Sequence, residues 1–205
     1  MFIEPIAQPA RPLARSLPAF LPGSFAIERG SRRDYLALEH FHYLPRRPSS
    51  WALVLRIVYR ERDASEPGSR VIAVGVLSYP VLSCRLRERA LGLTYDTKAR
   101  RIIFANRHIR SISRVIVHPQ FRALGLASLL VRQLIDSCPT RYVEALAVMG
   151  RAHPFFKCAG MRAFHPETDS RPVYYLFDRH AASPIEPPAA AEVSSTSPRH
   201  HPTVC

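Results

Sequence analysis

The residues with the clearest chemical meaning lie in HPQFRALGLAS at 118–128, between an apolar segment and an amphipathic one. The apolar segment at 112–118 predicts a strand, and the apolar spacing over about 124–136 predicts a helix. A helix that begins directly after a strand presents unpaired backbone N–H groups at the positive end of its dipole, and such groups bind anions. Gly125 lets a ligand approach the main chain, and Arg122 adds a positive charge. The pattern R-x-x-G-x-A is therefore suited to a pyrophosphate.

The elements that must position this loop follow from the apolar patterning of the rest of the chain. It predicts further strands at 25–30, 51–61, 71–82, 142–149 and 172–179, and helices at 32–44 and in HPFFKCAGM at 153–161. The strands at 51–61 and 71–82 form a hairpin. The helical connection between the strands at 112–118 and 142–149 makes that pair parallel. The sequence thus predicts an α+β fold, a three-layer α/β/α arrangement with a mixed central sheet that has an antiparallel front and a parallel centre.

The composition predicts one domain between two tails. Residues 1–24 are proline-rich and residues 181–205 combine Pro, Ala, Ser and Thr, so both are expected to be disordered around a domain at 25–180. No apolar run reaches the roughly 20 residues that a membrane span needs, so a cytoplasmic location without membrane contact is expected. The four cysteines are scattered without a C-x-x-C pair, which predicts neither a metal site nor a disulfide framework.

The net charge of +13 is the most prominent bulk property. The segment 83–111 forms a cationic insertion, and over 85–114 its arginines are candidates for contacts with the phosphates of DNA or RNA. Two other interpretations stay open: a solvated connection between elements, and an arginine content that reflects genome composition.

Two segments carry a resemblance to a known family. VIVHPQFRALGLASLLV resembles the acetyl-CoA-binding motif of the GCN5-related N-acetyltransferase (GNAT) superfamily, [RQ]-x-x-G-x-[GA] after a strand ending in V-x-P. ALAVMGRAHPFFKCAGM is similar to the family's next strand and short helix, which commonly end in FY-x-x-x-GF. The order of elements agrees over residues 25–178. DYLALEHFHYLP and EALAVMGRAHPFFKCAGM further resemble GNAT-like domains found beside or fused to ABC-type ATPase modules, so an ABC-type ATPase is an expected partner.

The resemblance implies a CoA-dependent N-acyltransferase with acetyl-CoA as co-substrate. The amides expected to hold the pyrophosphate belong to Arg122, Ala123, Leu124, Gly125, Leu126, Ala127 and Ser128. The pantetheine arm would pair like a strand with Ile116, Val117 and His118, and the Val117 amide would donate to the thioester carbonyl. An amine on the acceptor then attacks directly, so the protein orients the reactants and moves protons.

The chain departs from the family where a tyrosine usually protonates the leaving thiolate, because it has Phe155–Phe156 there. Phe156 is expected to pack in the core. His153 is a candidate proton donor, and the alternative is that it is only a loop residue. Glu144 is a candidate base, and the alternative is that its carboxylate pairs with an arginine.

The acceptor side has three candidate residues. His42, Tyr43 and Trp51 could line the acceptor pocket, or could pack in the core and anchor a loop. No metal is expected at His40 and His42, because residues two apart on a helix face different directions. The alternative function is a basic GNAT-like protein that modifies or binds nucleic acid without conventional acetyl transfer.

Overall fold

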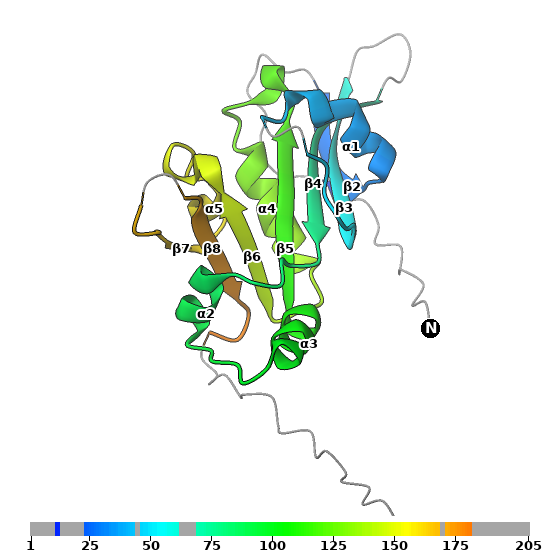
Figure 1. The fold of residues 1–205 in the computed structure, drawn as a ribbon. Coiled ribbons are helices and arrows are strands. Elements are labelled where there is room, and N and C mark those ends of the chain that lie inside the picture. The colour runs from blue at the N-terminus through cyan, green and yellow to red at the C-terminus, as the bar shows by residue number, and fades with distance from the viewer. Residues whose placement is uncertain (1–10, 13–22, 44–45, 62–68, 169–170, 182–205) are drawn as a thin grey trace, which may run out of the picture.

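An eight-stranded mixed sheet runs through the domain in the order β1-β2-β3-β4-β5-β6-β8-β7 (Figure 1). The computed structural model describes residues 11–12, 23–43, 46–61, 69–168 and 171–181. The strands are β1 (Arg11–Pro12), β2 (Gly23–Arg29), β3 (Leu53–Glu61), β4 (Ser69–Ser78), β5 (Ile109–Val117), β6 (Tyr142–Ala147), β7 (Arg162–Phe164) and β8 (Val173–Asp178). All neighbouring strands pair antiparallel except β5 and β6, which are parallel. The predicted antiparallel front and parallel centre are confirmed.

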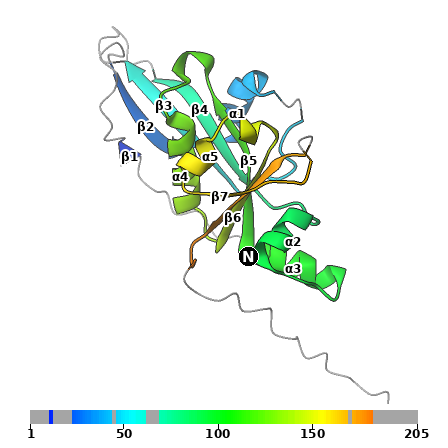
Figure 2. The same ribbon diagram turned by 90° about the vertical axis from the view of Figure 1, so that its left-hand side faces the viewer.

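Helices cover both faces of this sheet (Figure 2). The α-helices are α1 (Arg32–Leu38), α2 (Arg85–Leu91), α3 (Lys98–His108), α4 (Leu126–Asp136) and α5 (Phe155–Cys158), and the 3₁₀ helices are η1 (Glu39–Phe41), η2 (Pro119–Phe121) and η3 (Val148–Arg151). Helices α4 and α5 lie on one face, and α1, α2 and α3 on the other. The predicted three-layer arrangement is confirmed.

Helix α4 packs closely on the centre of the sheet. Its buried residues recur with the helical period, which gives one apolar face: Leu126, Leu130, Val131, Leu134 and Ile135. A Cβ at Gly75 of β4 would lie 2.7 Å from Leu134 Cδ1. The bare glycine therefore lets the helix approach the sheet, and this contact fixes the direction in which the start of α4 points.

The segment 83–111 is not merely a connection between strands, as one interpretation of the sequence held. Helices α2 and α3 enclose an apolar cluster against β6 and β8, with Leu91, Phe104, Ile109, Tyr142 and Tyr174 buried in it. The arginine-rich composition masks this pattern, because few apolar residues are enough to anchor each short helix.

The ends of the chain differ in part from the prediction. Residues 11–12, within the expected N-terminal tail, form a short strand that pairs with β2. Strand β2 itself begins at Gly23, which is two residues before the predicted start. Residues 1–10, 13–22 and 182–205 lie outside the described part of the chain. The predicted helix at 32–44 is shorter, since the α-helix ends at Leu38 and a single 3₁₀ turn follows.

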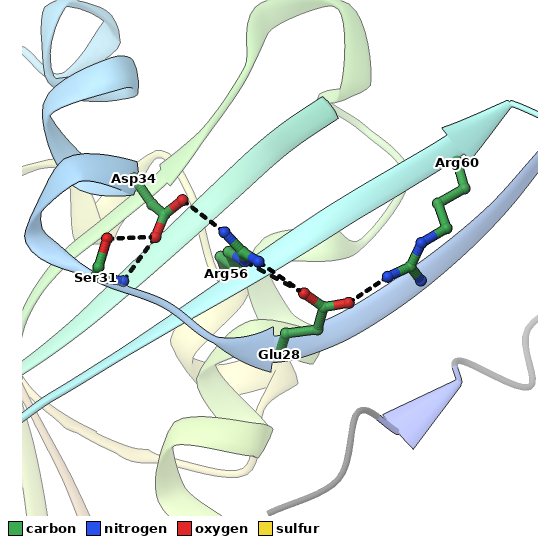
Figure 3. A network of polar contacts seen from close by, with 5 residues as sticks. All are labelled: Glu28, Ser31, Asp34, Arg56 and Arg60. Atoms are coloured by element: carbon green, nitrogen blue, oxygen red, sulfur yellow. Dashed lines mark hydrogen bonds and ion pairs between the residues drawn. The ribbon is translucent and has the colours of Figure 1, made fainter. Parts of the chain in front are cut away.

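A polar network fixes the start of α1 to the neighbouring strands (Figure 3). Asp34 Oδ2 accepts hydrogen bonds from the Ser31 backbone and hydroxyl at 2.6 and 2.8 Å, and Asp34 Oδ1 accepts one from Arg56 at 2.9 Å. Arg56 also donates a hydrogen bond to Glu28, and Glu28 forms a second ion pair with Arg60. Burial raises the pKa of Asp34, but the donors Ser31 and Arg56 outweigh it, so the pKa lies below its ordinary 3.8. The pKa of Glu28 is likewise lowered, because Arg56 and Arg60 outweigh burial.

We expect Arg56→Met to lower the free energy of unfolding at neutral pH by about 1–3 kcal/mol, because Asp34 loses its cation and Glu28 loses one of its two. Carboxyls with a lowered folded-state pKa stabilise the protein above their unfolded pKa values, and this contribution disappears as the pH falls through the folded values. Urea unfolding of the wild-type protein and the variant should therefore show that the difference between their free energies of unfolding shrinks as the pH falls from about 5 to about 3. A difference that stays constant over this range would contradict the assignment.

Candidate functional site

The central parallel strands form a fork. Strands β5 and β6 pair only from Ile109 with Tyr142 to Ser111 with Glu144. Beyond this point β5 continues to Val117 along β4, and β6 continues to Ala147 along β8. Figure 1 shows the two strands spreading apart, with α4 behind the opening. We call the opening between 112–117 of β5 and 145–147 of β6 the fork.

The hydrogen-bonding direction of β5 decides which amides face the fork. The register between β4 and β5 shifts at a bulge, so that Ser113 is the extra residue. After the bulge, the His118 amide donates to the Ile72 carbonyl of β4 at 2.8 Å. Because direction alternates along an antiparallel strand, the amide of Ile116 also faces β4, whereas those of Val115 and Val117 face the fork. Two main-chain donors are thus directed into the opening.

The loop between β5 and α4 presents further donors. After the single turn η2, Ala123 and Gly125 adopt left-handed conformations with φ of 65° and 74°. Gly125 is the N-cap of α4. Within the described part of the chain, no group accepts a hydrogen bond from the amides of 123–128. These amides, at the positive end of the α4 dipole, form a site suited to a phosphate or pyrophosphate. Ala123 is a residue whose unusual backbone the sequence did not indicate.

Positive charge accumulates beside this loop. The exposed Arg122 side chain donates through Nε to the Val117 carbonyl at 3.3 Å, so it lies at the upper end of the fork. Arg70 reaches His118 Nε2 at 2.9 Å. Burial, together with the neighbouring Arg70, His40 and Arg122, lowers the pKa of His118 below its ordinary value, so this ring is neutral near pH 7. The arginines supply the fixed charge that an anionic ligand needs.

The predicted cofactor residues therefore divide into two groups. The loop residues 123–128 present amides, Arg122 presents charge, and Val117 turns its amide away from β4 toward the fork. Ile116 and His118, also predicted, turn their amides to β4, and Ile116 is buried against α1. The sequence could not reveal this, because the bulge at Ser113 sets the alternation.

The contacts of Glu144 argue against the predicted role as a base. Its carboxylate is buried in an ion pair with Arg87, and Tyr174 donates a further hydrogen bond to it. Both oxygens already accept hydrogen bonds, so neither is free to take a proton from a substrate. This is the pairing with an arginine that the sequence left open.

The short helix after β6 has no hydroxyl at the position of the family's tyrosine. Phe156 is 5% exposed and its ring lies 5.0 Å from that of Tyr175, which agrees with the core packing expected for it. The Tyr175 hydroxyl donates to the Gly150 carbonyl at 2.8 Å, and burial raises its pKa. Tyr175 is thus a poor substitute acid. His153 is exposed on the loop before α5, and its role as proton donor stays a prediction.

The three predicted acceptor residues do not share one environment. Trp51 packs edge-on against Tyr35 of α1 at 5.1 Å, with Arg32 over its ring, so it supports the helix. Tyr43 is 53% exposed, and the His42 ring stacks on it at 4.8 Å. Tyr43 is therefore exposed to solvent, whereas Trp51 is mainly a packing residue, and the acceptor role of His42 and Tyr43 stays a prediction.

The arginines of 85–114 are largely engaged within the protein. Arg87 pairs with Glu144, Arg89 lies 3.6 Å from Glu167, and Arg100 pairs with Asp96. Arg101 lies 3.1 Å from Glu88. These ion pairs do not support the predicted nucleic-acid arm.

The described residues offer no alternative centre built on a metal. Among them, no group of three or more His, Cys, Asp or Glu side chains could hold an ion. No helix in this part of the chain has the length and apolar character to cross a membrane.

Comparison with known proteins shows what this loop and the strands around it are similar to. Residues 89–161 match the model of the acetyltransferase (GNAT) family, and this segment holds β5, the loop, α4 and β6. The match makes this segment similar to the GNAT acetyltransferase family, and the surrounding mixed sheet with its helices is GNAT-like. Nothing in the comparisons points to the subgroup associated with ABC-type ATPases. A search of curated proteins found no match.

Solved structures with a similar arrangement share little sequence with this chain. Arabidopsis thaliana NAA60 in complex with acetyl-CoA is 16% identical over 75% of this chain and 97% of that chain, with a TM-score of 0.47. The YhbS N-acetyltransferase of Escherichia coli in complex with CoA is 16% identical over 80% and 84%, with a TM-score of 0.44. The ribosomal-protein-S18-alanine N-acetyltransferase of Escherichia coli is 13% identical over 74% and 90%, with a TM-score of 0.42. Similarity at this level carries no argument about substrate.

The direction of the β5 amides can be tested in the ligand-free protein. We expect the amides of Ile116 and His118 to be protected from hydrogen exchange by β4, and those of Val115 and Val117 to exchange much faster. Residue-resolved exchange measured by NMR would check this pattern. Equal protection of all four amides would show that the fork is closed in solution.

Proposed function

We propose that this protein is a CoA-dependent N-acyltransferase that transfers an acetyl group from acetyl-CoA to an amine. One observation carries the proposal: unpaired amides of 123–128 follow directly on a strand, β5, whose Val115 and Val117 amides point away from β4 toward the side where β6 no longer pairs. The family match over 89–161 covers this strand and loop.

These residues fit the parts of acetyl-CoA. The amides of 123–128 and the side chain of Arg122 would hold the pyrophosphate. The fork leaves one edge of β5 without a partner strand, so it can take the amide groups of a pantetheine arm by strand-like pairing. Acetyl-CoA, when bound, supplies an acetyl group activated as a thioester.

The remaining chemistry belongs to the chain and the acceptor. The Val117 amide would donate a hydrogen bond to the carbonyl oxygen as negative charge develops there. An acceptor amine attacks directly, so no nucleophilic side chain is needed, and the fork orients the two reactants. A proton must leave the attacking amine and another must reach the departing thiolate. His153 is the side chain that we propose for the second transfer, since Phe156 has no proton to give.

The proposed coenzyme site can be tested with Gly125→Glu. A glutamate there places a side chain and a negative charge at the amides that would hold the pyrophosphate. We expect millimolar acetyl-CoA to raise the Tm of the wild-type protein by several degrees and to leave the Tm of this variant unchanged.

Gly92→Glu is the matched control for this experiment. Gly92 also has a positive φ, 62°, and an added Cβ there meets no atom within 4 Å. It should share the backbone strain and the added charge but keep the wild-type response to acetyl-CoA. The absence of any shift in the wild-type protein would refute the coenzyme assignment, and an equal shift in the Gly125 variant would refute the placement.

A further inference from the structure

A buried polar cluster that the proposed reaction does not use lies where β5 and β6 separate. Arg87 donates to Glu144 from Nε to Oε2 and from NH2 to Oε1, both at 2.7 Å. The Tyr174 hydroxyl donates to Glu144 Oε2 at 3.0 Å. The side chains of Arg87 and Glu144 are 2% and 1% exposed, and Tyr174 is fully buried. We call these three residues the fork clasp.

The fork clasp joins four segments that are distant in sequence. Glu144 comes from β6, Tyr174 from β8 and Arg87 from α2. Arg87 NH2 also donates to the Val81 carbonyl at 2.8 Å, in the loop that leads from β4 to α2. Figure 1 shows this loop passing across β5 toward α2. One guanidinium thus connects β6 with the loop that leaves β4.

The position of the fork clasp along the strands is specific. Glu144 opposes Ser111, and this is the last residue pair between β5 and β6. The next residues of β6 pair with β8 alone. The ion pair therefore sits at the apex of the fork, where a shift of one residue would lengthen or shorten the free edge of β5.

Stability alone gives little reason for such a cluster. A buried ion pair gains little net stability over apolar residues of similar size, although removing one partner leaves an uncompensated buried charge. Its geometry, in contrast, is narrowly defined, because a bidentate pair tolerates little displacement.

We propose that the fork clasp fixes the point at which β5 and β6 separate, so that Arg87, Glu144 and Tyr174 position the groove for the acyl carrier. Glu144 is then a positioning residue and not a proton acceptor. What the groove holds rests on the proposed function, whereas the geometric claim applies to the protein alone.

The double variant Arg87→Met/Glu144→Met separates positioning from stability. Apolar replacement of the pair should keep the Tm within about 5 °C of wild type. We expect amide exchange in the ligand-free variant to accelerate at 109–111 and 142–144, because the last strand pairs open. Unchanged exchange at these residues in a folded double variant would overturn the proposal.

The second measurement is the Kd for acetyl-CoA by calorimetry. We expect the double variant to bind at least about ten-fold more weakly than wild type, since the fork no longer holds one geometry. Arg56→Met is the control, because it loses an ion-pair network away from the fork and should keep the wild-type Kd. A double variant with wild-type affinity would show that the clasp is only structural.

Tyr174→Phe keeps the proposal testable if the double variant does not fold. It retains the ion pair and removes one hydrogen bond, so exchange at Glu144 should accelerate and the Kd should rise about two- to five-fold. Wild-type exchange in this variant would count against the proposal. If the wild-type protein does not bind acetyl-CoA, the proposed function fails, and the exchange measurements alone decide on the clasp.

Discussion

The candidate site depends on main-chain hydrogen-bonding groups that neither the sheet nor α4 satisfies. The first amides of a helix have no partner within the helix, so a fixed run of them at the positive end of its dipole can bind an anionic group. Here the amides of 123–128 have no partner among the described residues, and those of Val115 and Val117 point away from β4. The direction of these amides comes from backbone geometry, so substitution of the side chains at these positions can leave the hydrogen-bond donors in place.

Three features position these amides and the fork. Gly75 allows α4 to approach the sheet, which directs the helix N-terminus at the loop. The bulge at Ser113 sets which amides of β5 turn toward β6. The buried pair of Arg87 and Glu144 occupies the apex where the strands part. Each feature is remote from the proposed acetyl group, and in our proposal they act together to define where acetyl-CoA would lie.

The local parts of this arrangement could be predicted from the sequence. The strand, the glycine turn and the helix around Gly125 follow from apolar spacing and from the conformational freedom of glycine. The sequence could not predict that the Val117 amide points toward the fork and the Ile116 amide toward β4, because this depends on a bulge formed with β4. Nor could it predict the partner of Glu144, since 57 positions separate this residue from Arg87. Helices α2 and α3 could not be predicted either, because arginines stand between the few apolar residues that anchor these short helices and mask their spacing.

The most direct test of this account is a map of backbone amide chemical shifts as acetyl-CoA is added to the ¹⁵N-labelled protein. The account predicts that the largest changes fall on the amides of 123–128 and on those of Val115 and Val117, with small changes at Ile116 and His118. Saturable binding that leaves these amides unchanged, or no change anywhere at millimolar acetyl-CoA, would contradict it.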